Sequence, residues 1–160
     1  MDKKRILVAF SVGGVAGAMV VYKRMKIRLE GEIKKTEKYN QLYKLMVLWM
    51  EIKQNGQSIA GYLRDREYNN IAIYGMFLVG ERLYVELQDE KFTVSYGIDR
   101  SMGNIFEGIK IYKPMDTLPK TDAIVVTAVA DFACIKRELE KQLDCPILSI
   151  TDILNEISIM

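Results

Sequence analysis

A short apolar segment that ends in one glycine, with a second glycine five residues later, constrains this chain more than any other feature. The segment runs Ile71-Ala72-Ile73-Tyr74-Gly75, and Gly80 follows it at the start of a helix-like pattern. This is the form of a strand, a tight turn and a helix N-terminus in a βαβ unit. The first glycine permits the sharp turn, and the last lets helix and strand pack closely. We therefore expect a strand–turn–helix unit at residues 71–87.

The start of the expected helix suits a phosphate group. Its backbone N–H groups lack intrahelical partners and carry a partial positive charge. The candidate phosphate-binding residues are Gly75, Met76, Phe77, Leu78 and Gly80. Phe77 stands where a middle glycine would let a pyrophosphate approach the backbone. Its ring either fills that space or points away and leaves the helix N-terminus free, and the sequence favours neither alternative.

The rest of the chain after residue 70 alternates between strand-like and helix-like segments. Strands are expected at 71–74, 92–96, 109–112, 122–127 and 146–150, and helices at 78–87, 132–143 and 151–157. The apolar run at 122–127 is typical of a strand buried on both faces. Alternation of this kind predicts an α/β fold, a Rossmann-like parallel sheet in the order 3-2-1-4-5 with flanking helices.

Ligands of such sheets bind at the carboxyl ends of the strands, near the point where strand order reverses. Asp99 and Arg100 follow the second expected strand, and Thr127 and Ala128 follow the fourth. Asp99 lies 24 residues after Gly75, near the spacing at which an acid accepts hydrogen bonds from an adenosine ribose. Arg100 is placed to meet a 2′-phosphate instead, and Thr127 and Ala128 to line the opposite wall. Alternatively, Asp99 only forms a turn and 127–128 is an ordinary loop.

Residues 6–22 form an uncharged, mostly apolar run with Lys and Arg on both sides. As a helix this run covers roughly 25 Å, a little less than the ~30 Å hydrocarbon core of a membrane, and flanking Lys and Arg can extend it. We expect a transmembrane anchor at 1–28. The basic residues after the run predict a single-pass protein of the cell membrane with a cytoplasmic C-terminal domain. A cleaved signal peptide is the alternative.

Small residues recur every four positions in this run, at Ala9, Gly13 and Gly17. Such spacing lets two membrane helices approach closely, so it suggests a homodimer or a membrane-protein partner. Small residues are also common in membrane helices that do not pair.

Residues 29–55 are expected to form a helical spacer before a Rossmann-like domain at 56–160. The first half of the spacer is mostly charged, and an apolar stripe follows at helical spacing. The stripe consists of Leu42, Leu45, Met46, Trp49 and Ile52. We expect it to dock onto the globular domain.

Composition excludes several functions. The net charge of +2 gives no argument for nucleic-acid binding. The chain has no histidine, and therefore lacks the commonest general base and metal ligand. Cys134 and Cys145 have no metal-type spacing, so we expect two reduced structural cysteines and no metal.

The stretch from Ile52 to Ile157 resembles Rossmann-like domains of the nucleoside-diphosphate-sugar epimerase/dehydrogenase type, as found beside cell-surface polysaccharide proteins in Gram-positive bacteria. The resemblance rests on residues 58–63 (SIAGYL), 71–75 (IAIYG), 80–83 (GERL), 96–99 (YGID) and 145–147 (CPI). It implies that Gly75 and Gly80 occupy phosphate-loop positions and that Asp99 is the acid after the second strand. It also implies a link to polysaccharide biosynthesis.

Three functions follow as expectations. The first is a membrane-anchored domain that binds a nucleotide or dinucleotide, NAD(P) or a nucleotide-sugar, without completing a reaction alone. The second is an interaction module without a small ligand, in which Met76, Phe77 and Leu78 form an apolar surface. The third is a nucleotide-sugar oxidoreductase or epimerase, for which Tyr96 or Lys113 would have to act as the acid.

Overall fold

The computed structural model of the chain describes residues 3–101, 103 and 105–160, with the backbone alone for 3–18 and 20. The chain divides into two compact units, Met1–Gln41 and Leu42–Met160. Helix α1, Lys3–Gln54, contributes to both units. The candidate site belongs entirely to the second unit.

The second unit alternates strands and helices, as the pattern of apolar segments indicated. After the end of α1 come α2 (Ile59–Asp65), β1 (Asn70–Tyr74), α3 (Leu78–Asp89), β2 (Thr93–Ile98), β3 (Ile105–Phe106) and β4 (Ile109–Tyr112). They are followed by β5 (Ala123–Val126), a 3₁₀ turn (Val129–Asp131), α4 (Phe132–Leu139), β6 (Ile147–Ser149) and α5 (Ile150–Ser158).

The sheet is mixed, which corrects the expectation of a purely parallel sheet. Its order is β3-β4-β2-β1-β5-β6. Strands β4, β2, β1, β5 and β6 are parallel and follow one another in the expected order, whereas β3 is antiparallel to β4. The cause is a two-residue hairpin loop in which Glu107 and Gly108 both have positive φ, 43° and 89°. Positive φ at both positions is the geometry that joins antiparallel strands tightly.

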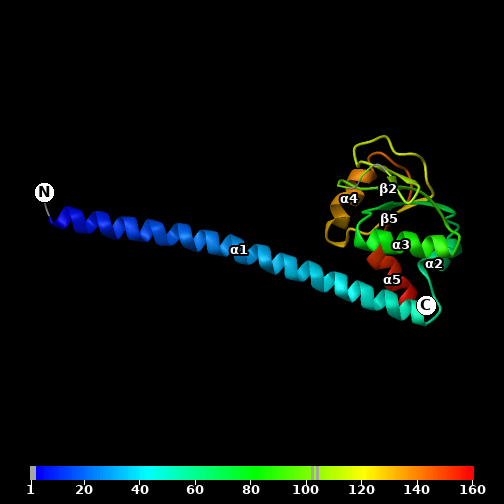
Figure 1. Ribbon diagram of the computed structural model, residues 1–160, viewed down its shortest axis with the longest axis horizontal. Coiled ribbons are helices and arrows are strands. Elements are labelled where there is room, and N and C mark those ends of the chain that lie inside the picture. The colour runs from blue at the N-terminus through cyan, green and yellow to red at the C-terminus, as the bar shows by residue number, and fades with distance from the viewer. Residues whose placement is uncertain (1–2, 102, 104) are drawn as a thin grey trace. The chain divides into compact units, whose positions relative to one another are not determined.

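Helices cover both faces of the sheet (Figure 1), and a separate apolar core lies on each. In one core, α2, α3, α5 and the end of α1 pack against the face of the sheet that carries Ile71 and Ile73 of β1. The other packs α4 against the face that carries Ala72 and Tyr74. Because neighbouring residues of β1 point to opposite buried faces, the strand is apolar almost throughout.

The end of α1 belongs to the first of these cores. Leu45, Trp49 and Ile52 are buried there. Their spacing places them on one helical face, which agrees with the expected docking of the apolar stripe.

Among the residues that the structure describes, none of the helices contains an apolar stretch that could span a bilayer. This corrects the prediction of a transmembrane anchor at 1–28 and of a single-pass location in the cell membrane. A membrane span needs about 20 mostly apolar residues, whereas the described side chains of α1 include Lys23, Arg24, Lys26 and Arg28. Most of the apolar run, with Ala9, Gly13 and Gly17, has side chains outside the described residues.

Candidate functional site

The turn after β1 has the geometry that its two glycines predicted. Gly75 has a φ of +90°, and its N–H donates to the Ile98 carbonyl of β2 at 2.8 Å. A Cβ atom on Gly80 would lie 2.1 Å from the Gly75 carbonyl oxygen and 3.6 Å from Ile73 Cγ2. The first glycine therefore makes the turn, and the second allows α3 to lie directly against β1.

Phe77 does not pack into the turn. It is the N-cap residue of α3, with extended backbone (φ −81°, ψ −170°), and its side chain is 70% exposed. Met76 points the other way and is fully buried; a Cβ on Gly97 of β2 would lie 2.7 Å from Met76 Cγ. The notion that the Phe77 ring is packed in place of a pyrophosphate is therefore not supported.

The first N–H groups of α3 lack hydrogen-bond partners in the described part of the chain. In the described part of the chain, no acceptor is hydrogen-bonded to the N–H of Leu78, Val79 or Gly80, whereas Glu81 N–H donates to the Phe77 carbonyl at 3.1 Å. Unpaired N–H groups at the start of a helix, together with its dipole, attract anions.

Asp99 lies against this turn. Its Oδ2 accepts a hydrogen bond from Met76 N–H at 2.9 Å, and its Oδ1 accepts one from Ser101 N–H at 2.8 Å. The acid after β2 and the start of α3 are thus joined by one hydrogen bond.

Thr127 closes the other side of the turn. Its Oγ1 contacts the carbonyl oxygens of Gly75 and Tyr74, and its N–H donates to the Tyr74 carbonyl at 2.9 Å. A Cβ on Gly75 would lie 2.7 Å from Thr127 Oγ1 and 3.5 Å from Ala128 N. Thr127 and Ala128 therefore pack directly on the turn.

Arg100 points away from the turn toward α4. Its Nη2 lies 3.5 Å from Glu138 Oε2, and both side chains are partly exposed. The sequence placed Arg100 beside Asp99 correctly but gave no sign of its partner, because the contact depends on how α4 packs.

Tyr96 is not placed to act as an acid toward a ligand. Its hydroxyl donates to the Pro119 carbonyl at 2.8 Å, and burial raises its pKa to about 12. Lys113, the other candidate acid, has its Nζ 3.4 Å from the Arg100 carbonyl. Among the residues searched, no group of three or more Asp, Glu or Cys side chains is arranged to hold a metal ion.

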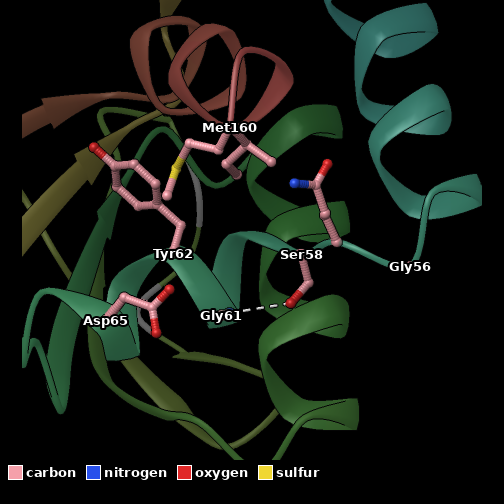
Figure 2. A pocket seen from close by; sticks show the side chains of 8 residues that line it. Gly56, Ser58, Gly61, Tyr62, Asp65 and Met160 are labelled. Atoms are coloured by element: carbon pink, nitrogen blue, oxygen red, sulfur yellow. Dashed lines mark hydrogen bonds between the residues drawn. The ribbon is translucent and has the colours of Figure 1, made fainter.

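A shallow hollow lies elsewhere, beside α2 and the end of α5 (Figure 2). Its volume is about 180 Å³, below the roughly 300 Å³ at which typical ligand pockets begin. Its lining residues are Gly56, Gln57, Ser58, Gly61, Tyr62, Asp65, Ile157 and Met160. Ser58 Oγ already accepts the Gly61 N–H at 3.0 Å as the cap of α2.

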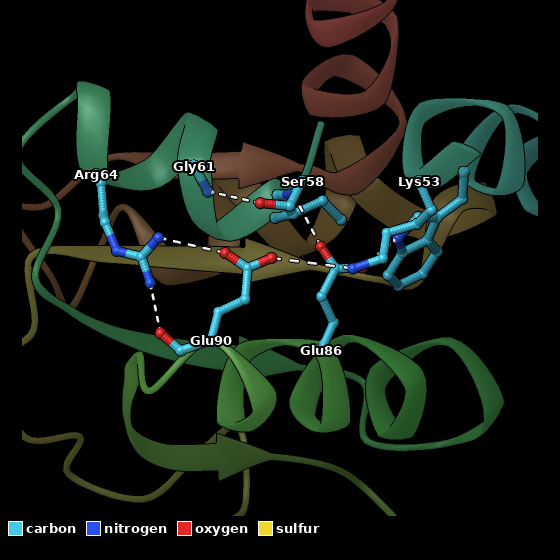
Figure 3. A network of polar contacts seen from close by, with 8 residues as sticks. Lys53, Ser58, Gly61, Arg64, Glu86 and Glu90 are labelled. Atoms are coloured by element: carbon cyan, nitrogen blue, oxygen red, sulfur yellow. Dashed lines mark hydrogen bonds and ion pairs between the residues drawn. The ribbon is translucent and has the colours of Figure 1, made fainter. Parts of the chain in front are cut away.

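A buried carboxylate on α3 connects this helix to α1 and α2, a contact that no sequence motif predicted (Figure 3). Glu86 Oε2 accepts from Trp49 Nε1 at 2.7 Å, and Oε1 accepts from Ile59 N–H at 2.9 Å. Lys53 Nζ lies 3.5 Å from Oε2. The available signal was a Glu on the apolar face of a helix. These contacts fix α3 at its C-terminal half, opposite the end that faces the candidate site.

No protein-family model, curated protein or solved structure matches the chain. The comparisons therefore identify no relative of the nucleoside-diphosphate-sugar epimerase/dehydrogenase type, and the function is argued from the geometry of the site.

Proposed function

We propose that the carboxyl edge of β1 and β2 binds a nucleotide, with a phosphate on the N-terminus of α3 and the ribose on Asp99. The observation that carries this proposal is the 2.9 Å hydrogen bond between Met76 N–H and Asp99 Oδ2. It holds the acid against the turn residue that lies two positions before the first residue of α3, so that one ligand can reach both. NAD(P) and nucleotide-sugars share this ribose–phosphate part.

Three features support the phosphate position. The N–H groups of Leu78, Val79 and Gly80 have no acceptor among the described residues. Helix α3 has 12 residues, enough for a useful helix dipole. The Phe77 backbone is extended and its ring is exposed, so the ring is not packed inside the turn.

A proline substitution tests the phosphate contact without altering the helix. Leu78 is the first residue of α3, a position where proline is well tolerated, and the extended backbone of Phe77 suits a residue before proline. Leu78→Pro therefore removes one N–H donor and little else. With NADH and UDP-glucose as probes, we expect about tenfold or more loss of affinity by calorimetry on the full chain, as for a hydrogen bond to a charged group.

Leu78→Ala is the matched control, because it truncates the same side chain and keeps the N–H. It should bind both probes like the wild type. Equal affinity of Leu78→Pro and Leu78→Ala, or no binding of either probe to the wild type, would contradict the proposal.

An interaction module is a second candidate, and the exposed side chains at the rim favour it. Phe77 is 70% and Leu78 is 53% exposed, an apolar pair at the mouth of the site. If the wild type binds neither probe but Phe77→Gly binds them, the ring blocks the site and this candidate is preferred. Unchanged absence of binding in Phe77→Gly would give it no support.

A further inference from the structure

The hydroxyl of Tyr74 is buried at the end of β1, beside the Arg100 guanidinium. Tyr74 is 5% exposed, and its hydroxyl makes no hydrogen bond of ordinary geometry among the described residues. Buried polar groups are nearly always paired, and an unpaired one destabilises the folded protein. An unsatisfied hydroxyl at the ligand-binding edge of a sheet is a feature that a ligand can satisfy.

The charged neighbours of Tyr74 come from the loop after β2 and from α4. Burial raises the pKa of the Tyr74 hydroxyl, and the neighbouring Arg100 guanidinium opposes that rise through its positive charge and through its contact with the hydroxyl. Glu138 and Asp99 lie close enough to add a smaller increase. The hydroxyl is therefore protonated at neutral pH and able to donate a hydrogen bond.

We propose that Tyr74 and Arg100 together bind a second acidic group of the nucleotide ligand, a phosphate or a carboxylate, and that Glu138 occupies Arg100 until this group arrives. The inference rests on the proposed function. Tyr74 lies two residues before Met76, and Arg100 directly follows Asp99, so the second acidic group would bind beside the ribose–phosphate part.

The chemistry of the three side chains fits this exchange. A guanidinium forms paired, charge-assisted hydrogen bonds with phosphate and carboxylate oxygens, and a tyrosine hydroxyl adds a neutral donor. The ion pair between Arg100 and Glu138 is 3.5 Å long and partly exposed, so it contributes little and is readily exchanged. A ligand oxygen would keep the charge of Arg100 paired and also satisfy Tyr74.

Two ligand pairs test the inference, because each pair differs by one acidic group. NADPH has one phosphate more than NADH, and UDP-glucuronate has a carboxylate where UDP-glucose has a hydroxymethyl group. In calorimetry on the full chain, we expect about tenfold tighter binding of the acidic member of at least one pair. The pair that shows it identifies the acidic group as phosphate or carboxylate.

Variants test whether these residues cause the preference, defined as the ratio of the affinities for the acidic and the non-acidic member of a ligand pair. Arg100→Gln and Tyr74→Phe should lower this ratio at least threefold, while the non-acidic member binds as before. Glu138→Gln should raise it, because Arg100 is no longer occupied. Glu140→Gln is the matched control on the same stretch of chain, since Glu140 pairs with Lys136 at 3.9 Å, and it should leave the preference unchanged.

Tyr74→Phe also has a readout without ligand. The ring stays buried and the unpaired hydroxyl is removed, so the melting temperature of the ligand-free chain should rise by about 2–6 °C. A rise in stability combined with a loss of preference is not expected of a residue that only packs. A fall in melting temperature would show that the hydroxyl has a partner, and would overturn the inference.

The outcomes separate the inference from the function on which it rests. If both members of each pair bind equally, and Leu78→Pro weakens both, nucleotide binding stands and the second acidic site is wrong. If no probe binds, both proposals are wrong.

Discussion

Gly80 combines two opposing effects at a single residue. Replacing a glycine inside a helix with alanine ordinarily stabilises the helix by up to ~1 kcal/mol. Here the new Cβ would lie 2.1 Å from the Gly75 carbonyl oxygen, a backbone atom that cannot move aside. We predict that Gly80→Ala lowers the free energy of unfolding by about 2–3 kcal/mol, as measured by urea denaturation.

Gly31→Ala is the control for Gly80→Ala. It makes the same change within α1, where a Cβ would meet nothing within 4 Å. It should leave the free energy of unfolding unchanged or raise it by up to ~1 kcal/mol, and should not lower it. If Gly80→Ala were equally harmless, the close packing of α3 on β1 would be wrong.

At this scale the sequence predicted backbone roles well and side-chain partners poorly. The spacing of Gly75 and Gly80 follows from turn geometry and close packing, which are local properties. The partners of Asp99, Thr127 and Arg100 depend on which loops meet at the sheet edge, and no local pattern records them. The burial of the Tyr74 hydroxyl could not be predicted for the same reason, because the sequence indicates only that Tyr74 belongs to an apolar strand.

At the scale of elements, long periodic segments were predicted and short ones were missed. The apolar strands β1 and β5 and helix α3 are evident from periodicity and from runs buried on both faces. Strand β3 has two residues, too few for any alternation to be visible. The Glu107-Gly108 turn that makes β3 antiparallel is also a weaker hairpin signal than Asn-Gly or Asp-Gly.

Glu86 is the residue through which α3 holds two other helices. Glu86→Gln keeps the size of the side chain but replaces one carboxylate oxygen with an amide nitrogen, which faces either the Trp49 or the Ile59 donor. We predict a loss of about 2–3 kcal/mol in the free energy of unfolding, because a buried donor loses its acceptor and the charge is removed. Trp49, the only tryptophan, should report the change in its fluorescence maximum.

Glu90→Gln is the matched control, at the C-cap of α3, four residues after Glu86. Its carboxylate meets Lys53 at 3.9 Å and Arg64 at 3.2 Å, and these partners are about half exposed. Exposed ion pairs contribute roughly 0–1 kcal/mol. If Glu90→Gln lowered the free energy of unfolding as much as Glu86→Gln, the loss would come from removing a negative charge in this region and not from the buried contacts of Glu86.

At the scale of the whole molecule, the sequence predicted the apolar stripe of α1 but not that this stripe is part of the core of the folded unit. The compact unit begins at Leu42, whereas the expected domain begins at residue 56, just after Asn55 and at Gly56. A glycine turn marks the end of a helix, and it carries no information about which core that helix completes. The buried side chains of Leu45, Trp49 and Ile52 decide this.

Two fragments test where the folded unit begins. Residues 42–160 retain the whole core and should unfold cooperatively, with a free energy of unfolding close to that of the full chain. Residues 56–160 lack Leu45, Trp49 and Ile52, whose burial contributes about 1.5–3 kcal/mol each. The sum approaches the total stability of an ordinary domain, ~5–15 kcal/mol. This fragment should therefore be largely unfolded, with a much lower urea midpoint when unfolding is followed by circular dichroism. Equal urea midpoints for the two fragments would show that the end of α1 merely rests on a core that is complete without it.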